Sequence, residues 1–281
     1  MEIISSIIEM KKLAAHEEKS GKKIGFIPTM GFLHEGHLSL VDLLRDCSDL
    51  LILSIFVNPT QFGVGEDLEN YPRNTTRDIE LCRERGVDIV FIPQEKDLYL
   101  DDSSTFVSEE IASKKLCGLA RPTHFRGVTT ICAKLFNLCR PSFVALGQKD
   151  AQQIVVLKRM IRDMHFPIEV KVGPTIRESD GLAMSSRNQY LNSSQREDAL
   201  LINRALEAGK SLVVKKGITN ADRVKAELMS ILRSGRFLRI NYAEVVNCET
   251  MRVESEIQPG RSMLVVAAWV DSVRLIDNVK L

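Results

Sequence analysis

The sequence predicts an α/β fold in which a parallel sheet with covering helices is followed by a smaller α+β domain. Short apolar runs alternate with amphipathic helical segments through the first part of the chain, as in parallel sheets with helical crossovers. The run 50–57 is apolar at nearly every position, as expected of a strand that is covered on both faces. After the segment 176–188 the pattern changes to two long amphipathic helices and then strands, which indicates a second domain.

Each element of the predicted parallel sheet domain has a local signal. Ser5 or Ser6 can cap a first helix that ends near Gly21. Further helices are expected after residue 38, at 75–85 with Gly86 as the stop signal, at 128–138, and after residue 149. Strands are expected at 24–27, 50–57, 88–92, 143–146 and 168–172.

The remainder of the chain predicts the smaller domain. Helices are expected at 193–215 and 220–233, and strands at 241–246, 263–270 and 273–276. The last two strands would form a hairpin around Asp271 and Ser272. We place the boundary between 175 and 180 and therefore divide the chain into residues 1–176 and residues 177–281.

The composition of the chain limits the kinds of molecule that it is expected to bind. The 281 residues carry 38 Lys and Arg against 37 Asp and Glu, which argues against nucleic acid or a membrane surface as the main partner. The start of the chain shows no secretory signal pattern, and no apolar run is long enough to span a bilayer. The six cysteines include no Cys-x-x-Cys pair. We therefore expect a cytoplasmic protein with reduced thiols.

The most informative stretch is 28–40, which lies between an expected strand and an expected helix. Gly31 and Gly36 allow the backbone to approach a ligand closely. The start of the new helix offers unpaired N–H groups and the positive end of a dipole, which suit a phosphate. His34 and His37 are three residues apart and would lie on one face of that helix start. The stretch therefore predicts a phosphate site with built-in proton donors.

Three alternative interpretations of this stretch can be compared with its residues. A phosphate loop that ends in Gly-Lys-Ser/Thr does not fit, because His37 and Leu38 occupy the positions of the Lys and the hydroxyl residue. A zinc helix of the His-Glu-x-x-His type does not fit, because His34 and His37 are one residue too close. A glycine-rich turn with two incidental histidines stays open on this stretch alone.

Two further loops carry polar groups beside glycine and proline. The loop 58–63 follows a buried strand, and open parallel sheets bind their ligands at the edge where strands end. The amide of Gln61 both donates and accepts, which suits a hydroxyl or carboxylate of a small substrate, although a solvated loop glutamine is the alternative. The stretch 118–128 contains Arg121, His124 and Arg126, which predicts either an anion-facing loop or a charged surface turn.

A second glycine turn joins a strand to a helix at Gly147. Lys149 in this turn can pair with a triphosphate as a point charge, and Gln153 would face the same edge one helical turn later. The later stretch 176–188 includes Ser185, Ser186 and Arg187. These side chains predict either a flexible polar clamp that follows phosphates or an ordinary interdomain linker.

Taken together, these stretches resemble the pantothenate synthetase (pantoate–β-alanine ligase) family. This family belongs to a nucleotidyltransferase superfamily that carries a His-x-Gly-His motif, which this chain has at residues 34–37. The resemblance extends in order and spacing over nearly the whole chain, and it departs only mildly at Gln148, where Glu was also expected. It implies a Rossmann-like nucleotide-binding domain, residues 1–176, with a smaller α+β lid domain, residues 177–281.

The resemblance also implies a two-step ligation. The pantoate carboxylate attacks the α-phosphate of ATP to give pantoyl adenylate and pyrophosphate, and the amine of β-alanine then gives pantothenate and AMP. His34, His37 and Lys149 would be catalytic, with His37 as the general acid. Gln61 and Gln153 would bind pantoate, and Gln61 would also face β-alanine. The residues implied in ATP binding are Met30, Gly31, Phe32, Leu33, His34, Glu35, Gly36, His37, Gly147, Gln148, Lys149, Asp150, Ile176, Met184, Ser185, Ser186 and Arg187.

Mg²⁺ is expected to arrive with ATP, bound mainly by phosphate oxygens and water, and the resemblance implies a homodimer. The loop 61–71 and the segment 184–188 are expected to close over the adenylate and exclude water from it. Two other classes stay open on the residues. A sister enzyme would transfer AMP to a phosphorylated acceptor, and a non-catalytic module would only bind a nucleotide.

Overall fold

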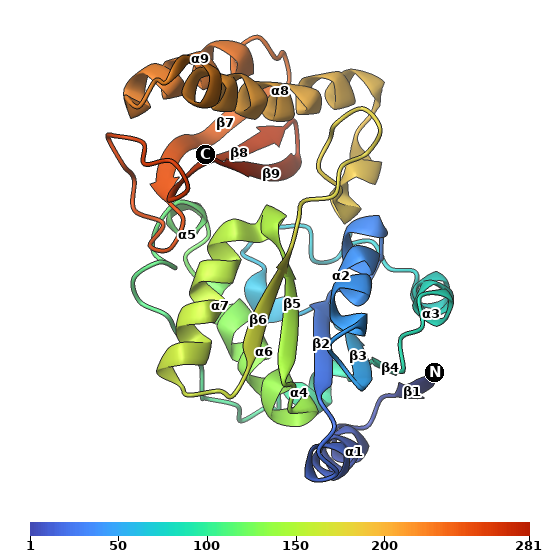
Figure 1. The fold of residues 1–281 in the computed structure, drawn as a ribbon. Helices are drawn as coiled ribbons and strands as arrows, with labels where there is room; N and C mark the ends of the chain where they lie inside the picture. Colours follow the sequence, from blue (N-terminus) through green and yellow to red (C-terminus); the bar gives the residue numbers. More distant parts are fainter.

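The computed structural model describes all 281 residues, and its centre is a parallel sheet (Figure 1). Six strands lie in the order β1-β4-β3-β2-β5-β6, and every pairing is parallel. Their bounds are β1 (Glu2–Ile4), β2 (Ile24–Thr29), β3 (Leu50–Ile55), β4 (Ile89–Phe91), β5 (Phe143–Gly147) and β6 (Glu169–Gly173). The five strands expected from the sequence are confirmed. Strand β1 was missed because three residues are too few to show a period.

Helices cover both faces of this sheet, as the apolar strands required. On one face α1 (Ile7–Lys19), α6 (His124–Cys139) and α7 (Ala151–Asp163) pack against a core that includes Phe26 and Ile52. On the other face α2 (Glu35–Arg45) and α3 (Thr75–Glu84) pack against a core that includes Ile27 and Leu53. The short elements are α4 (Glu95–Leu98), α5 (Cys117–Ala120) and the 3₁₀ turns η1 (Pro59–Gln61), η2 (Gln148–Asp150) and η3 (Ser186–Tyr190).

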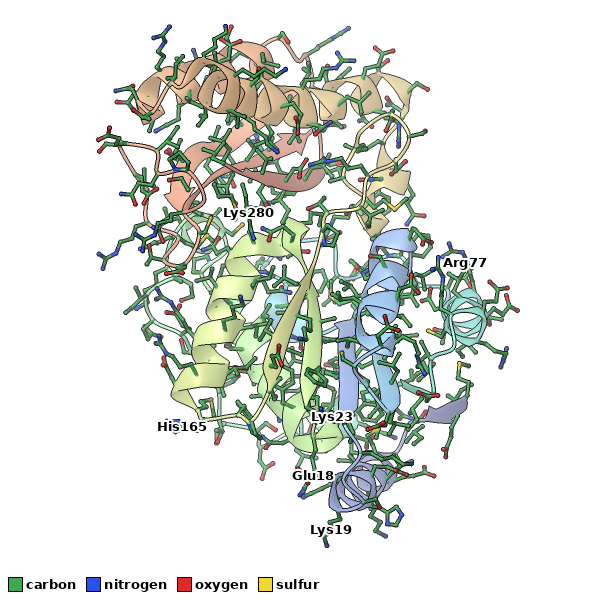
Figure 2. The ribbon with its side chains drawn as sticks, viewed as in Figure 1. Glu18, Lys19, Lys23, Arg77, His165 and Lys280 are labelled. Atoms are coloured by element: carbon green, nitrogen blue, oxygen red, sulfur yellow. The ribbon has the colours of Figure 1, made fainter.

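Helix α1 shows how the apolar pattern sets the orientation of a helix. The hydroxyl of Ser6 accepts a hydrogen bond from the N–H of Glu9, so the expected cap is present. Met10 and Ala14 are fully buried, whereas Glu18 and Lys19 lie exposed at the edge of the molecule (Figure 2). This division between an apolar and a charged face is the one that the sequence predicted.

Helix α6 begins earlier than expected. The sequence placed its start at Val128, but the structure places it at His124. His124 and Arg126 therefore lie in the first turns of a helix, not in a loop. Gly127 inside the helix weakened the sequence signal, and it is there because the backbone of η1 passes against it.

The second part of the chain forms a smaller α+β unit beyond the carboxyl edge of the parallel sheet (Figure 1). Its helices α8 (Ser193–Lys216) and α9 (Ala221–Leu232) cover an antiparallel sheet of β7 (Leu238–Asn247), β8 (Ser262–Val270) and β9 (Val273–Lys280). The expected hairpin is confirmed, with Asp271 at a φ of 54° in the turn. None of the helices combines the length and apolar character that crossing a membrane demands.

Side chains from β9 fasten this unit to the parallel sheet domain. The buried Asn278 donates to the carbonyl oxygens of Gln148 and Lys149, both at 2.9 Å. The carboxylate of Asp277 accepts two bonds, at 2.6 and 3.1 Å, from Arg177 in the segment that follows the parallel sheet. Strand β9 therefore supports the turn that follows β5, where the sequence predicted a phosphate partner.

Candidate active site

Two adjoining cavities lie where the parallel strands end and the smaller unit begins. We call the one that His34 and His37 line the histidine cavity. The other, which Arg121, His124 and Arg274 line, we call the arginine cavity. The residues that line both are Met30, Gln61, Lys149, Asp150, Gln153, Ser185 and Arg187. The two cavities therefore meet at residues that the sequence had singled out.

The two histidines cap helix α2 reciprocally. The Nδ1 atom of His34 accepts a hydrogen bond from the N–H of Gly36 at 3.1 Å, and the Nδ1 atom of His37 accepts one from the N–H of His34 at 3.3 Å. The ring centroids are 4.0 Å apart, so the prediction that both rings lie together at the helix start is confirmed. The N–H groups of His34 and Gly36 are not unpaired, however, because these rings occupy them.

This geometry fixes where each ring carries its proton. Because Nδ1 accepts in both rings, the neutral tautomer places the hydrogen on Nε2. Burial, with the charges of Lys149 and Arg77, lowers the pKa of His34 to about 3. Burial, His34 and Lys149 also lower the pKa of His37 well below its usual value. Near pH 7 the pair is therefore neutral and offers two Nε2–H donors.

The loop before α2 is held by a residue that the sequence analysis missed. Asp78 on α3 is buried and accepts hydrogen bonds from the N–H groups of Phe32 and Leu33, both at 2.7 Å. Gly31 and Phe32 have positive φ angles of 81° and 50°, and a Cβ on Gly31 would lie 2.9 Å from Ile55. The backbone here turns toward α3, and the N–H groups of Phe32 and Leu33 are therefore occupied by the carboxylate of Asp78.

Most of the expected ATP residues line the histidine cavity, namely Met30, His34, Gly36, His37, Gly147, Lys149, Asp150, Ile176, Met184, Ser185, Ser186 and Arg187. Five do not line either cavity, namely Gly31, Phe32, Leu33, Glu35 and Gln148. Glu35 pairs with Arg85 at the surface, and Gln148 bonds to Asn278. We expected these five at the cavity because they are close in sequence to His34, His37 or Lys149. Contacts with α3, with the residue that follows it and with β9 hold several of them away from it.

Both glutamines predicted to bind substrate line the two cavities, and one is tightly oriented. The Oε1 atom of Gln61 accepts from the amide of Asn58 at 3.0 Å, and its Nε2 lies 3.1 Å from the sulfur of Met30. Asn58 is itself buried, and its Oδ1 accepts from Thr60 and from Tyr99, at 2.9 and 2.8 Å. No local pattern marks Asn58 as important, since Tyr99 is 41 residues away. The apolar wall beside Gln61 consists of Phe56, Val128, Ile131, Cys132 and Leu135.

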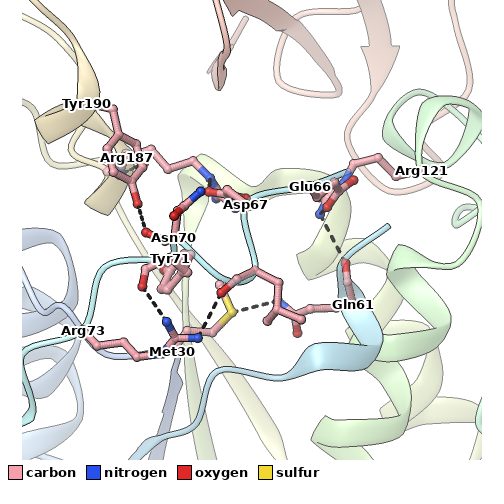
Figure 3. Close-up of polar contacts among 12 residues, drawn as sticks. Met30, Gln61, Glu66, Asp67, Asn70, Tyr71, Arg73, Arg121, Arg187 and Tyr190 are labelled. Atoms are coloured by element: carbon pink, nitrogen blue, oxygen red, sulfur yellow. Dashed lines mark hydrogen bonds and ion pairs between the residues drawn. The ribbon is translucent and has the colours of Figure 1, made fainter. Parts of the chain in front are cut away.

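The predicted phosphate clamp makes contact with the loop 61–71 (Figure 3). Arg187 donates to both oxygens of Asp67, at 2.7 and 2.9 Å, and its guanidinium lies 5.3 Å from the ring centre of Tyr71. Tyr190 donates to the carbonyl oxygen of Asn70 at 2.5 Å. The two segments that we expected to close together are therefore joined here, and Arg187 pairs with a carboxylate.

Lys149 and the serines take different partners. The ammonium of Lys149 donates to the carbonyl oxygen of Met184 at 3.3 Å and lies 3.8 Å from Asp150. Ser185 caps η3 by accepting from the N–H of Arg187, and Ser186 donates to the carbonyl oxygen of Phe32. The segment 176–188 thus lies along the cavity wall and is more than a linker between the domains.

On the other side, the same loop is held by Arg121, which follows α5 (Figure 3), and by His124 at the start of α6. Arg121 donates to both oxygens of Glu66, at 2.7 and 2.5 Å, and to the carbonyl oxygen of Gln61 at 3.2 Å. The Nδ1 atom of His124 lies 2.9 Å from that carbonyl, which can only accept, so Nδ1 carries the hydrogen. Burial and Arg121 lower the pKa of His124 to about 3. Arg126 instead lies exposed over the ring of Phe106.

Comparisons with known proteins show the family to which this chain belongs. The family model described as pantoate-beta-alanine ligase matches residues 2–280. The pantothenate synthetase of Thermosipho melanesiensis is 48% identical over 99% of each chain. The crystal structure of pantothenate synthetase from Thermus thermophilus has a TM-score of 0.94 at 39% identity, over 100% of this chain and 99% of that one.

A further structure adds information about ligands. The pantoate-beta-alanine ligase of Francisella tularensis, solved in complex with beta-gamma ATP and beta-alanine, has a TM-score of 0.81 at 31% identity. The match covers 100% of this chain and 97% of that one. With a family model and curated relatives matched along nearly their whole length, this chain belongs to the pantoate-beta-alanine ligase family.

Proposed function

We propose that this protein joins pantoate to β-alanine at the expense of ATP, through a pantoyl adenylate, with release of pyrophosphate and AMP. The observation that carries the proposal is the pair of neutral Nε2–H donors on His34 and His37, which share a cavity with Lys149 and Gln61. Membership of the family and the ATP-bound Francisella relative support it. It makes the protein a carbon–nitrogen ligase of the AMP-forming type.

In the first step, a pantoate carboxylate oxygen bonds to the α-phosphorus, and the bond between that phosphorus and the β-phosphate oxygen breaks. Two anions meet in this step, so preorganised donors lower its barrier. His34 and His37 would donate to the phosphate oxygens, and Lys149 would add a point charge. The negative phosphate raises the pKa of a neighbouring imidazole, which would allow His37 to act as the general acid.

Pantoate would lie in the histidine cavity beside Gln61 and Gln153. Gln61 and Gln153 would bind its hydroxyl and carboxylate groups through their amides. The apolar wall beside Gln61 suits a branched aliphatic body. Because Asn58 fixes the oxygen of the Gln61 amide, its NH₂ group is the one that faces a ligand. The pair Gln61 and Gln153 argues against a phosphorylated acceptor, as in the sister enzyme, because such an acceptor would call for more arginines in their place.

In the second step, the amine of β-alanine attacks the acyl carbon and the bond to the adenylate oxygen breaks, so AMP leaves with one carboxylate oxygen. Gln61, which lines both cavities, would face this amine. Water must be kept from the mixed anhydride. The joined loop 61–71 and clamp 184–188 would provide that barrier through Asp67 and Arg187.

Magnesium would enter with ATP. No group of three or more His, Cys, Asp or Glu side chains is arranged to hold a metal ion, which fits an ion held mainly by phosphate oxygens and water. We keep the division into residues 1–176 and residues 177–281 as part of the proposal, with the second part as the lid. The cytoplasmic location and the homodimer stay predictions.

An isotope experiment tests the proposal. Pantoate labelled with ¹⁸O in its carboxylate is incubated with purified protein, ATP, Mg²⁺ and β-alanine, and the AMP is analysed by mass spectrometry. The adenylate route transfers one labelled oxygen to each AMP. Pantothenate formed with unlabelled AMP would exclude that route. Transfer of AMP onto a phosphorylated acceptor, with release of pyrophosphate and no free AMP, would establish the sister activity.

A further inference from the structure

Among the cationic side chains of the arginine cavity, Arg274 is the one without a carboxylate partner. Arg121 pairs with Glu66 at 2.5 Å, Arg187 with Asp67 at 2.7 Å, and Lys149 lies 3.8 Å from Asp150. The remaining carboxylate on the cavity wall, Asp277, pairs with Arg177. No Asp or Glu oxygen lies within 4.0 Å of the Arg274 guanidinium, so its charge is uncompensated by any ion pair.

The groups that surround this guanidinium are weak acceptors. One Nη atom of Arg274 donates to the sulfur of Cys117 at 3.1 Å, and that sulfur lies 3.0 Å from the hydroxyl of Tyr242. The Nε atom is buried and has no hydrogen-bond partner. A thiol accepts hydrogen bonds poorly, and a partly buried charge without a strong partner is unfavourable. A ligand carboxylate would relieve that cost, because it can accept from two guanidinium N–H groups at once.

Arg274 lines the same cavity as the two glutamines that are expected to bind pantoate. The arginine cavity also contains Gln61 and Gln153, which border the histidine cavity. Cys117, which Arg274 contacts, donates its backbone N–H to Gln152, the neighbour of Gln153 on α7. Arg121, Arg187 and Arg274 also line an outer hollow at the surface. The arginine cavity thus leads from the surface toward the place where the acyl group would lie.

We propose that Arg274 binds the carboxylate of the β-amino acid substrate, and that the arginine cavity is the site of this second substrate. The inference rests on the proposed function and extends it, since only Gln61 was assigned to β-alanine above. β-Alanine carries its carboxylate and its amine at opposite ends of a two-carbon chain. A carboxylate held at Arg274 directs the amine toward Gln61 and the acyl carbon, while the adenylate occupies the histidine cavity.

The test separates the two half-reactions in the full-length protein. Arg274→Gln, Arg274→Lys and a control, Arg239→Gln, are compared with the unaltered protein. Arg239 on β7 pairs with Trp269, and Trp269 pairs with Arg274 on the next strand. Arg239 is exposed and does not line the arginine cavity, so it controls for the loss of one positive charge from the same sheet. Pantoate-dependent pyrophosphate–ATP exchange without β-alanine reports the first step, and pantothenate formation at varied β-alanine reports the second.

We expect Arg274→Gln to keep the exchange and to lower kcat/KM for β-alanine by about 10- to 100-fold, the effect of one lost charge-assisted hydrogen bond. Arg274→Lys is expected to recover part of that loss, and Arg239→Gln to show none. Equal kcat/KM for β-alanine in Arg274→Gln and the unaltered protein overturns the inference. Loss of the exchange together with synthesis also overturns it, because Arg274 would then act in the first step or in folding.

A comparison of two substrates distinguishes carboxylate binding by Arg274 from a purely structural role, which would not change the preference between them. β-Alaninamide has the shape of β-alanine without the negative charge. The unaltered protein should strongly prefer β-alanine over the amide, and Arg274→Gln should largely lose this preference. An unchanged preference ratio contradicts the inference. Absence of pantoate-dependent exchange in the unaltered protein contradicts the proposed function itself, and is thus distinguished from a failure at Arg274.

Discussion

At the scale of single residues, the central feature is a helix cap built from two imidazole rings. Helix starts are usually capped by Ser, Thr, Asp or Asn, but here His34 and His37 accept the backbone N–H groups. Each ring therefore keeps Nδ1 occupied and presents Nε2–H, so the local fold selects the tautomer. The hydrogen bonds that cap the helix thereby leave free the Nε2–H donors for which we propose a role toward phosphate.

The first prediction concerns the role of His37. We expect His37→Ala to fold and to lose about 100- to 1000-fold in turnover, the usual effect of removing one transition-state donor. His16→Ala, which removes an exposed imidazole from α1, serves as the control. Steady-state pantothenate formation and circular dichroism are measured together. Near-normal turnover in a folded His37→Ala protein would refute the role.

The second prediction concerns pH and stability. The pKa of His34 is about 3 in the folded protein, against 6.5 for an unperturbed histidine. The unfolded chain therefore binds this proton first as the pH falls. The stabilising effect of the neutral ring is complete above pH 6.5 and is lost between that pH and pH 3.

From pH 7 to pH 5 this ring should lower the free energy of unfolding by about 2 kcal/mol. His34→Asn keeps a side chain suited to the cap and should lose correspondingly less over the same interval. Urea denaturation at both pH values measures the difference. The same loss in both proteins would show that His34 is not the group that titrates.

At the scale of elements, the site depends on close approach between helix α6 and the turn η1. A Cβ on Gly127 would meet the backbone of Thr60 and lie 2.6 Å from the nitrogen of Gln61. The carbonyl oxygen of Gly127 also accepts from Asn58 at 3.2 Å. Gly127 therefore allows α6 to pack directly against η1, which carries Gln61, the residue expected to bind pantoate.

The third prediction is that Gly127→Ala destabilises the protein although alanine favours helices by about 1 kcal/mol. The clash is with backbone atoms, which cannot move aside without displacing Gln61. We expect a lower Tm and a higher KM for pantoate. Asn137→Ala, at an exposed position of the same helix, is the control and should not lower either stability or pantoate affinity. A Gly127→Ala protein of unchanged Tm and KM would contradict this account.

The sequence predicted much of the site because its informative residues are close together in the chain. The histidine pair, the glycine turns and the strand-end loops are local patterns, and all proved to lie near one edge of the sheet. Asp78, Asn58 and Arg274 were missed, since each acts through a partner that only the tertiary fold brings near. The separations are 45 residues to Leu33, 69 to Gly127 and 157 to Cys117. Strand β1 was missed because it has only three residues. The start of α6 was placed too late because Gly127 lies inside the helix and glycine usually marks a helix end.

At the scale of the whole molecule, the smaller unit completes the site, because β9 supports the turn after β5. Asn278 satisfies the carbonyl oxygens of Gln148 and Lys149. Arg187 and Tyr190, which lie before α8, hold the loop 61–71 across the cavity. The parts on either side of the predicted boundary therefore share the walls of both cavities.

The fourth prediction tests this dependence. Asn278→Ala removes three side-chain hydrogen bonds, two to the carbonyl oxygens of Gln148 and Lys149 and one from the amide of Gln148. It should lower the free energy of unfolding by about 3 kcal/mol. It should also lower the rate of adenylate formation, because the turn that carries Lys149 loses its support. Lys280→Ala, exposed on the same strand (Figure 2), is the control for a change in β9 alone. Full activity in Asn278→Ala would show that the smaller unit does not position this turn.

The central claim is that the histidine cavity forms an acyl adenylate from pantoate. The most direct measurement is the exchange of labelled pyrophosphate into ATP by purified protein with Mg²⁺ and pantoate, in the absence of β-alanine. We predict exchange that requires pantoate and that His37→Ala abolishes. Exchange without pantoate, or no exchange with it, would contradict the claim and leave a transferase that acts on a phosphorylated acceptor as the function to test.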